Sequence, residues 1–142
     1  MTNLTLDAAN LVISAAIAKG RELNLKPLSV AVLDEGGHLV AFQRSDGASN
    51  LRPDIAIGKA AGALALGVSS RKIGEMAADR PTFVSALAAI APRGIVPAAG
   101  GVIVVDGNGE TMGAVGVTGD LSDHDETCAL AGIASAGLVA EP

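Results

Sequence analysis

The chain has 142 residues and a formal net charge of −5, which fits one domain and is too short for two ordinary ones. Nearly half of the residues are hydrophobic, which excludes a disordered chain, and no basic run or aromatic platform points to nucleic acid. No apolar run reaches the ~20 residues that span a bilayer, and the start lacks a signal-peptide pattern. We therefore expect one domain over residues 1–142 with neither a membrane nor a nucleic acid as partner.

The apolar residues are mostly small or aliphatic: the chain has 18 Gly, two Phe, no Tyr and no Trp. Small side chains bury little area each, and such chains often gain stability by oligomerising. We therefore expect a homo-oligomer. The single Cys128 cannot form an internal disulfide, which favours a reducing compartment and a cytoplasmic location.

A first helix is expected after Thr5, whose side chain can cap it. Apolar residues then recur at helical spacing up to Leu23, and Asn24 can end the helix in a left-handed conformation before Pro27. Residues 28–34 and 38–44 follow as two strands joined by the turn Asp34-Glu35-Gly36-Gly37. Regular alternation would place His38, Val40, Phe42 and Arg44 on one face of the second strand.

Three helices are expected next. Asn50 or Ser49 can cap the first, which has Pro53 in its first turn and runs towards Gly67. Ser69 or Ser70 can cap a short second helix, and residues 82–91 read as the third.

A second hairpin joins the apolar strand 102–105 to a strand over 110–118 through the turn Asp106-Gly107-Asn108-Gly109. Ser122 with Asp125 resembles a capping box for a last helix that ends near Gly137. Antiparallel hairpins with helices between and after them predict a mixed α/β (α+β) architecture and not a doubly wound sheet.

The strand 38–44 carries the most informative side chains. His38 can ligate haem iron or act as an acid or base, and Arg44 can grip a carboxylate with two hydrogen bonds. The alternative is an exposed turn histidine with a solvated arginine. Asp46 can hold a substrate hydroxyl or move a proton, or it can serve the turn alone.

Lys59 lies in a helix between small neighbours, where partial burial would let it bind an anion or act as a base. An ordinary surface lysine is the alternative. Gly100-Gly101 can let a ligand approach the backbone or can only supply an unusual turn. Asp120, His124 and Cys128 are spaced four residues apart and form a weak metal pattern, so no metal site is predicted from them.

Four segments together resemble the GlcG/HbpS-like domains, which also occur as the C-terminal domain of PduO-type adenosyltransferases. They are Val32–Ala48 with its Asp-Glu-Gly-Gly-His turn, Ile57-Gly58-Lys59-Ala60, Pro97–Val102, and Gly113–Gly119 leading to Asp125–Ala129. The resemblance implies a profilin-like fold, with a five-stranded antiparallel sheet flanked by helices, and symmetric oligomers. It also implies haem or corrinoid binding, and in some members a part in small-molecule catabolism. By residue-wise transfer, the pocket would comprise His38, Arg44, Asp46, Lys59, Gly100, Gly101 and Thr118.

Three functions are therefore open. The first is binding of haem or a related tetrapyrrole, with haem as the expected cofactor. The second is a cofactor-free lyase or isomerase acting on a small oxo- or hydroxy-carboxylate or an aromatic acid. In that reading Arg44 and Lys59 hold the carboxylate, and His38 or Asp46 moves the proton. The third is an interaction domain without a ligand.

Overall fold

The computed structural model describes residues 4–142, which form helices and strands in alternating groups. The helices are α1 (Leu6–Glu22), α2 (Arg52–Leu66), α3 (Ser70–Asp79), α4 (Pro81–Ile90) and α5 (Ser122–Ser135). The strands are β1 (Ser29–Asp34), β2 (Leu39–Arg44), β3 (Gly101–Val105), β4 (Thr111–Thr118) and β5 (Val139–Glu141). Among these described helices, none is long and apolar enough to cross a membrane.

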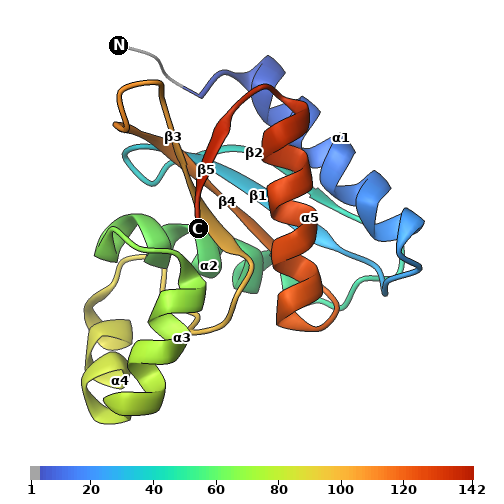
Figure 1. Cartoon of the computed structure of the whole chain (residues 1–142). Helices are drawn as coiled ribbons and strands as arrows, with labels where there is room; N and C mark the ends of the chain where they lie inside the picture. Colours follow the sequence, from blue (N-terminus) through green and yellow to red (C-terminus); the bar gives the residue numbers. More distant parts are fainter. Residues whose placement is uncertain (1–3) are drawn as a thin grey trace.

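All five strands form one antiparallel sheet in the order β2-β1-β4-β3-β5. Helices α1 and α5 cover one face of the sheet and α2 covers the other, while α3 and α4 project beyond one end (Figure 1). This arrangement confirms the predicted α+β class and the five-stranded antiparallel sheet flanked by helices.

The main hydrophobic core lies between the sheet and the pair α1–α5. Its largest members are fully buried aliphatic side chains from α1, from α5 and from alternate positions along the strands: Val12, Ile13, Val30, Val32, Val102, Val104, Val115, Val117 and Ile133. The layer on the opposite face of the sheet is thinner, because small residues let α2 pack very close to the strands. A β-carbon on Gly116 of β4 would overlap the carbonyl oxygen of Ala56 in α2.

Several local signals act as the sequence predicts. The Thr5 hydroxyl accepts a hydrogen bond from the Ala8 amide at 3.1 Å, and Ser69 caps α3 by accepting from Lys72. Asn24 follows α1 with φ 56°, and Gly67 ends α2 with φ 72°, both in the left-handed region. Pro53 lies in the first turn of α2. Both predicted hairpins are present.

Two predicted helix caps are wrong. Helix α2 begins after Leu51, so neither Ser49 nor Asn50 is its N-cap. Helix α5 begins after Leu121, so the Ser122–Asp125 pair does not form the predicted capping box. Asp125 instead turns into the protein, where it is 1% exposed. Burial beside a lysine from another helix outweighs the local capping preference of this carboxylate.

The predicted alternation along β2 is also wrong at its start. A β-bulge shifts the register so that Ala41 pairs with Val32 while Leu39 pairs with Leu33. Both Val40 and Ala41 then pack on the α1–α5 side. His38 lies outside the strand, in the turn, so alternation along β2 does not place its side chain.

Candidate functional site

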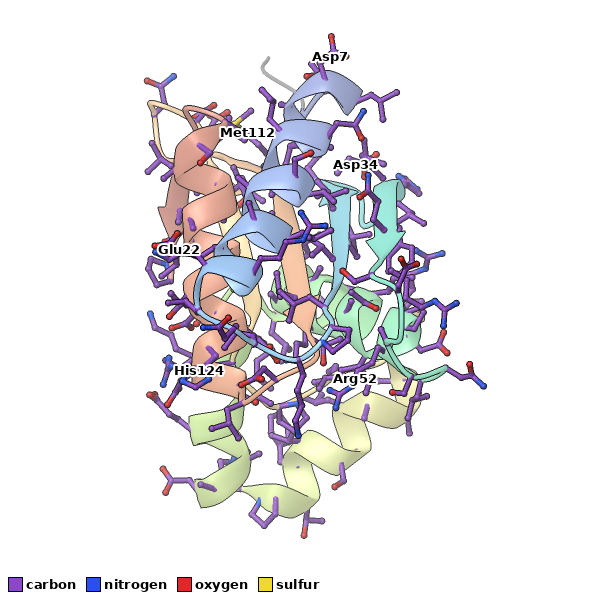
Figure 2. All side chains as sticks on the ribbon, turned by 90° about the vertical axis from the view of Figure 1, so that its right-hand side faces the viewer. Asp7, Glu22, Asp34, Arg52, Met112 and His124 are labelled. Carbon is purple, nitrogen blue, oxygen red and sulfur yellow. The ribbon has the colours of Figure 1, made fainter. Side chains whose placement is uncertain are left out.

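The predicted site residues lie at two opposite ends of the sheet. In the antiparallel register Ser29 pairs with Thr118, whereas Asp34 pairs with Gly113. Five residues of strand separate these positions, a distance of roughly 17 Å. Figure 2 shows the two ends, with Asp34 near one and Arg52 near the other. His38 belongs to the Asp34 end, and Thr118, Arg44 and Lys59 to the Arg52 end.

His38 is held by the turn that precedes β2. Its backbone amide and its ring Nδ1 both lie by Asp34 Oδ1, at 2.9 and 3.2 Å, and Gly36 N donates to the same oxygen at 3.0 Å. A β-carbon on Gly36 would lie 2.8 Å from the His38 ring, so the glycine leaves room for the imidazole in this position. The His38 side chain is 81% exposed. The turn therefore presents an oriented imidazole to solvent.

The Asp34 carboxylate is tuned by the same contacts. Partial burial alone would raise its pKa, but the hydrogen bonds from the His38 and Gly36 amides and the charge of His38 outweigh burial, so the pKa of Asp34 is lowered. Asp34 therefore remains an anion beside His38, and its contact with Nδ1 fixes the orientation of the imidazole ring.

A hollow of about 480 Å³ opens beside this imidazole. We call it the His38 hollow; it is lined by residues 35–39 of the turn, by Ala61, Leu64 and Ala65 of α2, and by residues 91–94 after α4. Its wall along α2 is aliphatic, and Glu35 and Arg93 add one acidic and one basic side chain to the lining. Sequence reasoning missed this lining because α2 and the loop after α4 are distant from His38 along the chain.

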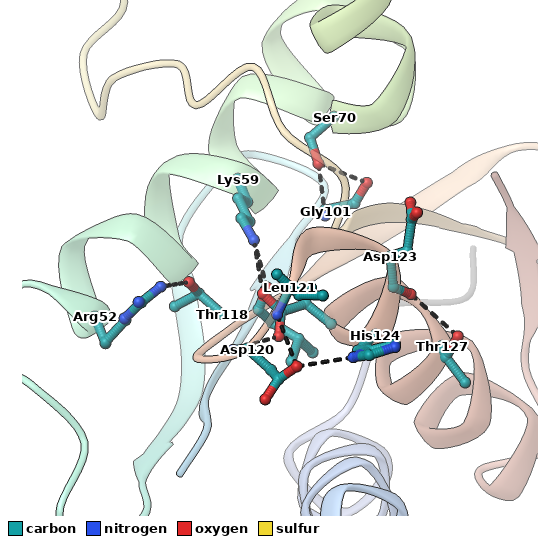
Figure 3. A network of polar contacts seen from close by, with 12 residues as sticks. Arg52, Lys59, Ser70, Gly101, Thr118, Asp120, Leu121, Asp123, His124 and Thr127 are labelled. Atoms are coloured by element: carbon teal, nitrogen blue, oxygen red, sulfur yellow. Dashed lines mark hydrogen bonds and ion pairs between the residues drawn. The ribbon is translucent and has the colours of Figure 1, made fainter. Parts of the chain in front are cut away.

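At the other end of the sheet, Lys59 forms a buried ion pair (Figure 3). Its Nζ lies 3.2 Å from Asp125 Oδ2 of α5 and donates to the Val117 carbonyl oxygen at 3.0 Å, and the residue is only 2% exposed. Burial lowers the pKa of Lys59 while the charge of Asp125 opposes that shift. Burial likewise raises the pKa of Asp125 against the opposing charge of Lys59.

The glycines of the 97–102 segment make room for this pair. Gly100 has φ 130°, and a β-carbon there would lie 2.8 Å from Lys59 Nζ. A β-carbon on Gly101 would overlap the Lys59 carbonyl, and the Gly101 amide donates to Ser70 Oγ at 2.7 Å. Because Gly100 and Gly101 have no side chains, Lys59 can pack directly against this part of the sheet.

A second polar contact lies about two turns earlier on α2. Arg52 Nη1 donates to Thr118 Oγ1 at 2.8 Å (Figure 3). Thr118 is buried, and its neighbour across the ladder, Ser29, has a fully buried hydroxyl that finds no hydrogen-bond partner within residues 4–142. The sequence offered no signal for Arg52 or Ser29, because only strand register and helix packing bring them to Thr118.

Arg44 and Asp46 lie at this same end but outside the ion pair. Arg44 pairs with Ser29 across the ladder, and its Nη1 donates to the Ala48 carbonyl oxygen at 3.0 Å. Asp46 is exposed and borders a smaller hollow of about 250 Å³ beside the end of α1. The structure therefore groups Lys59, Gly100, Gly101 and Thr118 closely, with Arg44 two strands away. Asp46 lies at this end but outside the group, and His38 lies at the opposite end.

The Asp120, His124 and Cys128 pattern resolves into separate contacts. His124 Nδ1 lies 2.8 Å from Asp120 Oδ1, while Cys128 is buried in the core between α1 and α5. Burial, together with the charge of Asp125, raises the pKa of Cys128 to about 11. In the described part of the chain, no three His, Cys, Asp or Glu residues cluster as a metal site would need.

The comparison with protein families gives one match that covers most of the chain. Residues 4–134 match the family described as haem degrading protein, HbpS-like. The chain belongs to the HbpS-like family. The 15.0 kDa protein of the dhaT-dhaS intergenic region of Citrobacter freundii is 33% identical over 129 residues, which cover 91% of this chain and 89% of that protein.

Solved structures agree with this membership. The crystal structure of HbpS matches at 32% identity with a TM-score of 0.81, covering 94% of this chain and 90% of that one. Klebsiella pneumoniae protein ORFY matches at 28% identity and a TM-score of 0.84, covering 96% and 93%. The PduOC haem complex shares the fold, with a TM-score of 0.86 at 20% identity over 99% and 100% of the two chains.

Proposed function

We propose that this HbpS-like chain binds haem or a related tetrapyrrole in the His38 hollow. The observation that carries the proposal is the combination found there: an exposed, oriented imidazole borders an aliphatic hollow of about 480 Å³. Ligand pockets in proteins fall in the range of ~300–1,000 Å³ and combine apolar walls with a few placed polar groups.

The donor chemistry of His38 fits an iron ligand. Asp34 engages Nδ1 at 3.2 Å, so Nε2 is the nitrogen left to face a metal. Histidine ligands commonly donate their other ring nitrogen to a carboxylate, which fixes the tautomer and makes the ligand more basic. Bound haem would supply redox or oxygen chemistry at its iron, while the protein holds the imidazole and its proton in place.

The walls of the hollow fit the rest of a tetrapyrrole. Leu39 and Leu64, with Ala61 beside them, offer an apolar surface to a macrocycle face. Arg93 at the rim offers a guanidinium to a propionate, which arginine can bind with two hydrogen bonds. Small residues on α2 keep that wall flat.

The relatives support the same ligand class. The matching family is described as haem degrading, and PduOC, which shares the fold, is described in complex with haem. The inference that this chain binds haem rests on its family and on the residues around His38, and not on the shared fold alone.

Titration with haemin tests the proposal. Wild-type protein should give a shifted Soret band, and His38→Ala should weaken binding at least tenfold and change the band. His124→Ala is the matched control, because His124 is the only other histidine and also contacts a carboxylate. If haemin gives no Soret shift, or if His38→Ala binds it as wild type does, the proposal fails.

A cofactor-free lyase or isomerase is the second candidate. Its specific support is the pair of cations near the end of β4, where Arg52 donates to Thr118 and Lys59 donates to the Val117 carbonyl oxygen. Lys59, however, is closed off by Asp125 and Gly100, so the lysine is placed to hold structure more than to move a proton. We therefore rank this candidate below haem binding.

Self-association forms part of the proposal. Helix α4 carries no charged residue and exposes Phe83 and Ile90, the latter 78% exposed. Helix α4 packs mainly on α3 and projects from the body (Figure 1). Such a face is typical of an interface between copies. Sedimentation at micromolar concentration should show an oligomer that Ile90→Glu dissociates, and a monomer in the wild type would overturn this part.

A further inference from the structure

We propose a second ligand site, for a small oxyanion such as a carboxylate, where Arg52 and Arg44 meet the end of the sheet. It is separate from the His38 hollow and lies at the opposite end of β1. The starting observation is Ser29, whose hydroxyl is fully buried and lacks a hydrogen-bond partner among the described residues. A buried polar group of this kind commonly indicates a water or ligand that the protein is built to hold.

The strand register shows what surrounds this hydroxyl. Ser29 of β1 pairs with Thr118 of β4 on one side and with Arg44 of β2 on the other. Directly opposed residues have β-carbons roughly 5 Å apart and project from the same face. That face is the one covered by α2, since Thr118 accepts its hydrogen bond from Arg52. The Ser29 and Thr118 hydroxyls thus lie on the α2 face with the Arg52 guanidinium on Thr118, and Arg44 lies next to Ser29 on the edge strand.

The charge at this position is positive and incompletely neutralised. The ion pairs in the described part of the chain include neither Arg44 nor Arg52. Within the described residues each arginine makes one hydrogen bond from Nη1, Arg44 to the Ala48 carbonyl oxygen and Arg52 to Thr118 Oγ1, which leaves further donors on both guanidinium groups. Lys59 nearby is already paired with Asp125 and contributes no net charge.

Side chains, and not the start of α2, supply the binding groups. The first turn of α2 already carries Asp54, the Arg52 amide donates to the Ser49 carbonyl oxygen, and Pro53 has no N–H. Planar guanidinium forks match the two oxygens of a carboxylate, and the Ser29 and Thr118 hydroxyls can donate to the same group. Carboxylate and inorganic phosphate share this oxyanion chemistry.

Thermal melting and calorimetric titration with sodium acetate, sodium benzoate and inorganic phosphate, against sodium chloride at equal ionic strength, test the site. We expect at least one oxyanion to raise the melting temperature of wild type where chloride does not. Arg52→Gln should weaken that binding about tenfold or more, as expected for loss of a charged hydrogen bond. Preference among the three probes distinguishes a carboxylate site from a phosphate site.

Ser29→Ala is the decisive variant because the two explanations predict opposite results. If the hydroxyl serves no ligand, its removal leaves the free protein equally or more stable and oxyanion binding unchanged. If the site exists, Ser29→Ala lowers oxyanion affinity while the free protein keeps its melting temperature. Equal affinity in wild type, Ser29→Ala and Arg52→Gln would overturn the proposal, as would an absence of stabilisation by all three oxyanions.

A matched arginine variant keeps this test separate from the haem proposal. Arg93→Gln changes the rim of the His38 hollow at the other end of the sheet. It should weaken haemin binding and leave oxyanion binding intact, whereas Arg52→Gln should do the reverse. Loss of oxyanion binding in Arg93→Gln would place the oxyanion in the His38 hollow and refute a second site.

Discussion

Lys59 of α2 and Asp125 of α5 form an ion pair through the end of the sheet, with Nζ 3.2 Å from Oδ2 and both side chains almost inaccessible. The two helices cover opposite faces, so this contact joins the two layers of the fold around the end of β4. The other oxygen of Asp125 accepts from the Asp120 amide at 3.0 Å, which fixes the turn between β4 and α5. The pair therefore secures the position of the segment that follows Thr118.

Removing one partner of this pair should be costly. Lys59→Met leaves Asp125 as an uncompensated buried carboxylate, and we expect a loss of about 3–5 kcal/mol in the free energy of unfolding. Denaturant unfolding measures this loss. Lys19→Met, which breaks the exposed pair with Glu22, is the control and should cost no more than about 1 kcal/mol. Equal effects of the two variants would contradict a structural role for the buried pair.

Replacing both partners should cost less than the sum of the single changes. The double variant Lys59→Met, Asp125→Leu leaves no unpaired charge in the interior, and well-packed apolar replacements of buried pairs are often near neutral. A double-mutant cycle from the same unfolding curves gives the coupling. Additive losses would show that the two groups do not act as a pair.

The close approach of α2 to β4 predicts a position-specific glycine effect. Gly116→Ala would place a β-carbon against the Ala56 carbonyl oxygen, so helix and strand must separate, and we expect a loss of about 1–3 kcal/mol or more. Gly107→Ala in the β3–β4 turn is the control, since a β-carbon there meets nothing within 4 Å. Thermal unfolding of the two variants should differ clearly; equal melting temperatures would contradict this packing.

Cys128 should be chemically inert while the protein is folded. Its thiol is buried, and burial together with the nearby Asp125 charge raises its pKa to about 11, so little thiolate exists at neutral pH. Labelling with a thiol reagent at pH 7 should proceed at the rate of unfolding and become rapid in denaturant. Rapid labelling of the folded protein would contradict the burial of Cys128.

Asp120 should stabilise the protein in a pH-dependent way. Hydrogen bonds from the Lys26 amide, the His124 ring and the Leu121 amide lower the pKa of this partly buried carboxylate below its ordinary value of 3.8. A lowered folded-state pKa contributes stability that is present above 3.8 and is lost as pH falls through the folded-state value. The melting temperature of wild type should therefore exceed that of Asp120→Asn at about pH 6, and the gap should narrow towards about pH 3. A gap that widens on acidification would contradict this sign.

The sequence predicted the elements that depend on local chemistry. Thr5, Ser69 and Gly67 each mark a helix end through a cap or a left-handed turn, and the turns Asp34-Glu35-Gly36-Gly37 and Asp106-Gly107-Asn108-Gly109 mark the hairpins. The strand β5 was not predicted, because its three residues at the edge of the sheet carry too little pattern.

The site depended on contacts that local sequence does not encode. Asp125 carries the signature of a cap, yet it pairs with Lys59, 66 residues earlier. Arg52 reaches Thr118 only because α2 crosses the end of β4. The bulge near Leu39 placed Val40 on the α1–α5 side, and His38 lies in the turn before the strand, where alternation does not apply. Resemblance to a family assigned His38, Arg44, Asp46, Lys59, Gly100, Gly101 and Thr118 to one pocket. The structure brings Lys59, Gly100, Gly101 and Thr118 together, and the contacts of Ser29 and Arg52 required the strand register.

Chemical rescue of the His38 ligand tests the central proposal most directly. Haemin is added to His38→Ala, and the absorption spectrum is recorded before and after titration with free imidazole. We predict that His38→Ala with haemin differs from wild type and that imidazole, entering the space left by the side chain, restores the wild-type Soret band. Identical spectra of wild type and His38→Ala before imidazole is added would contradict haem ligation by His38.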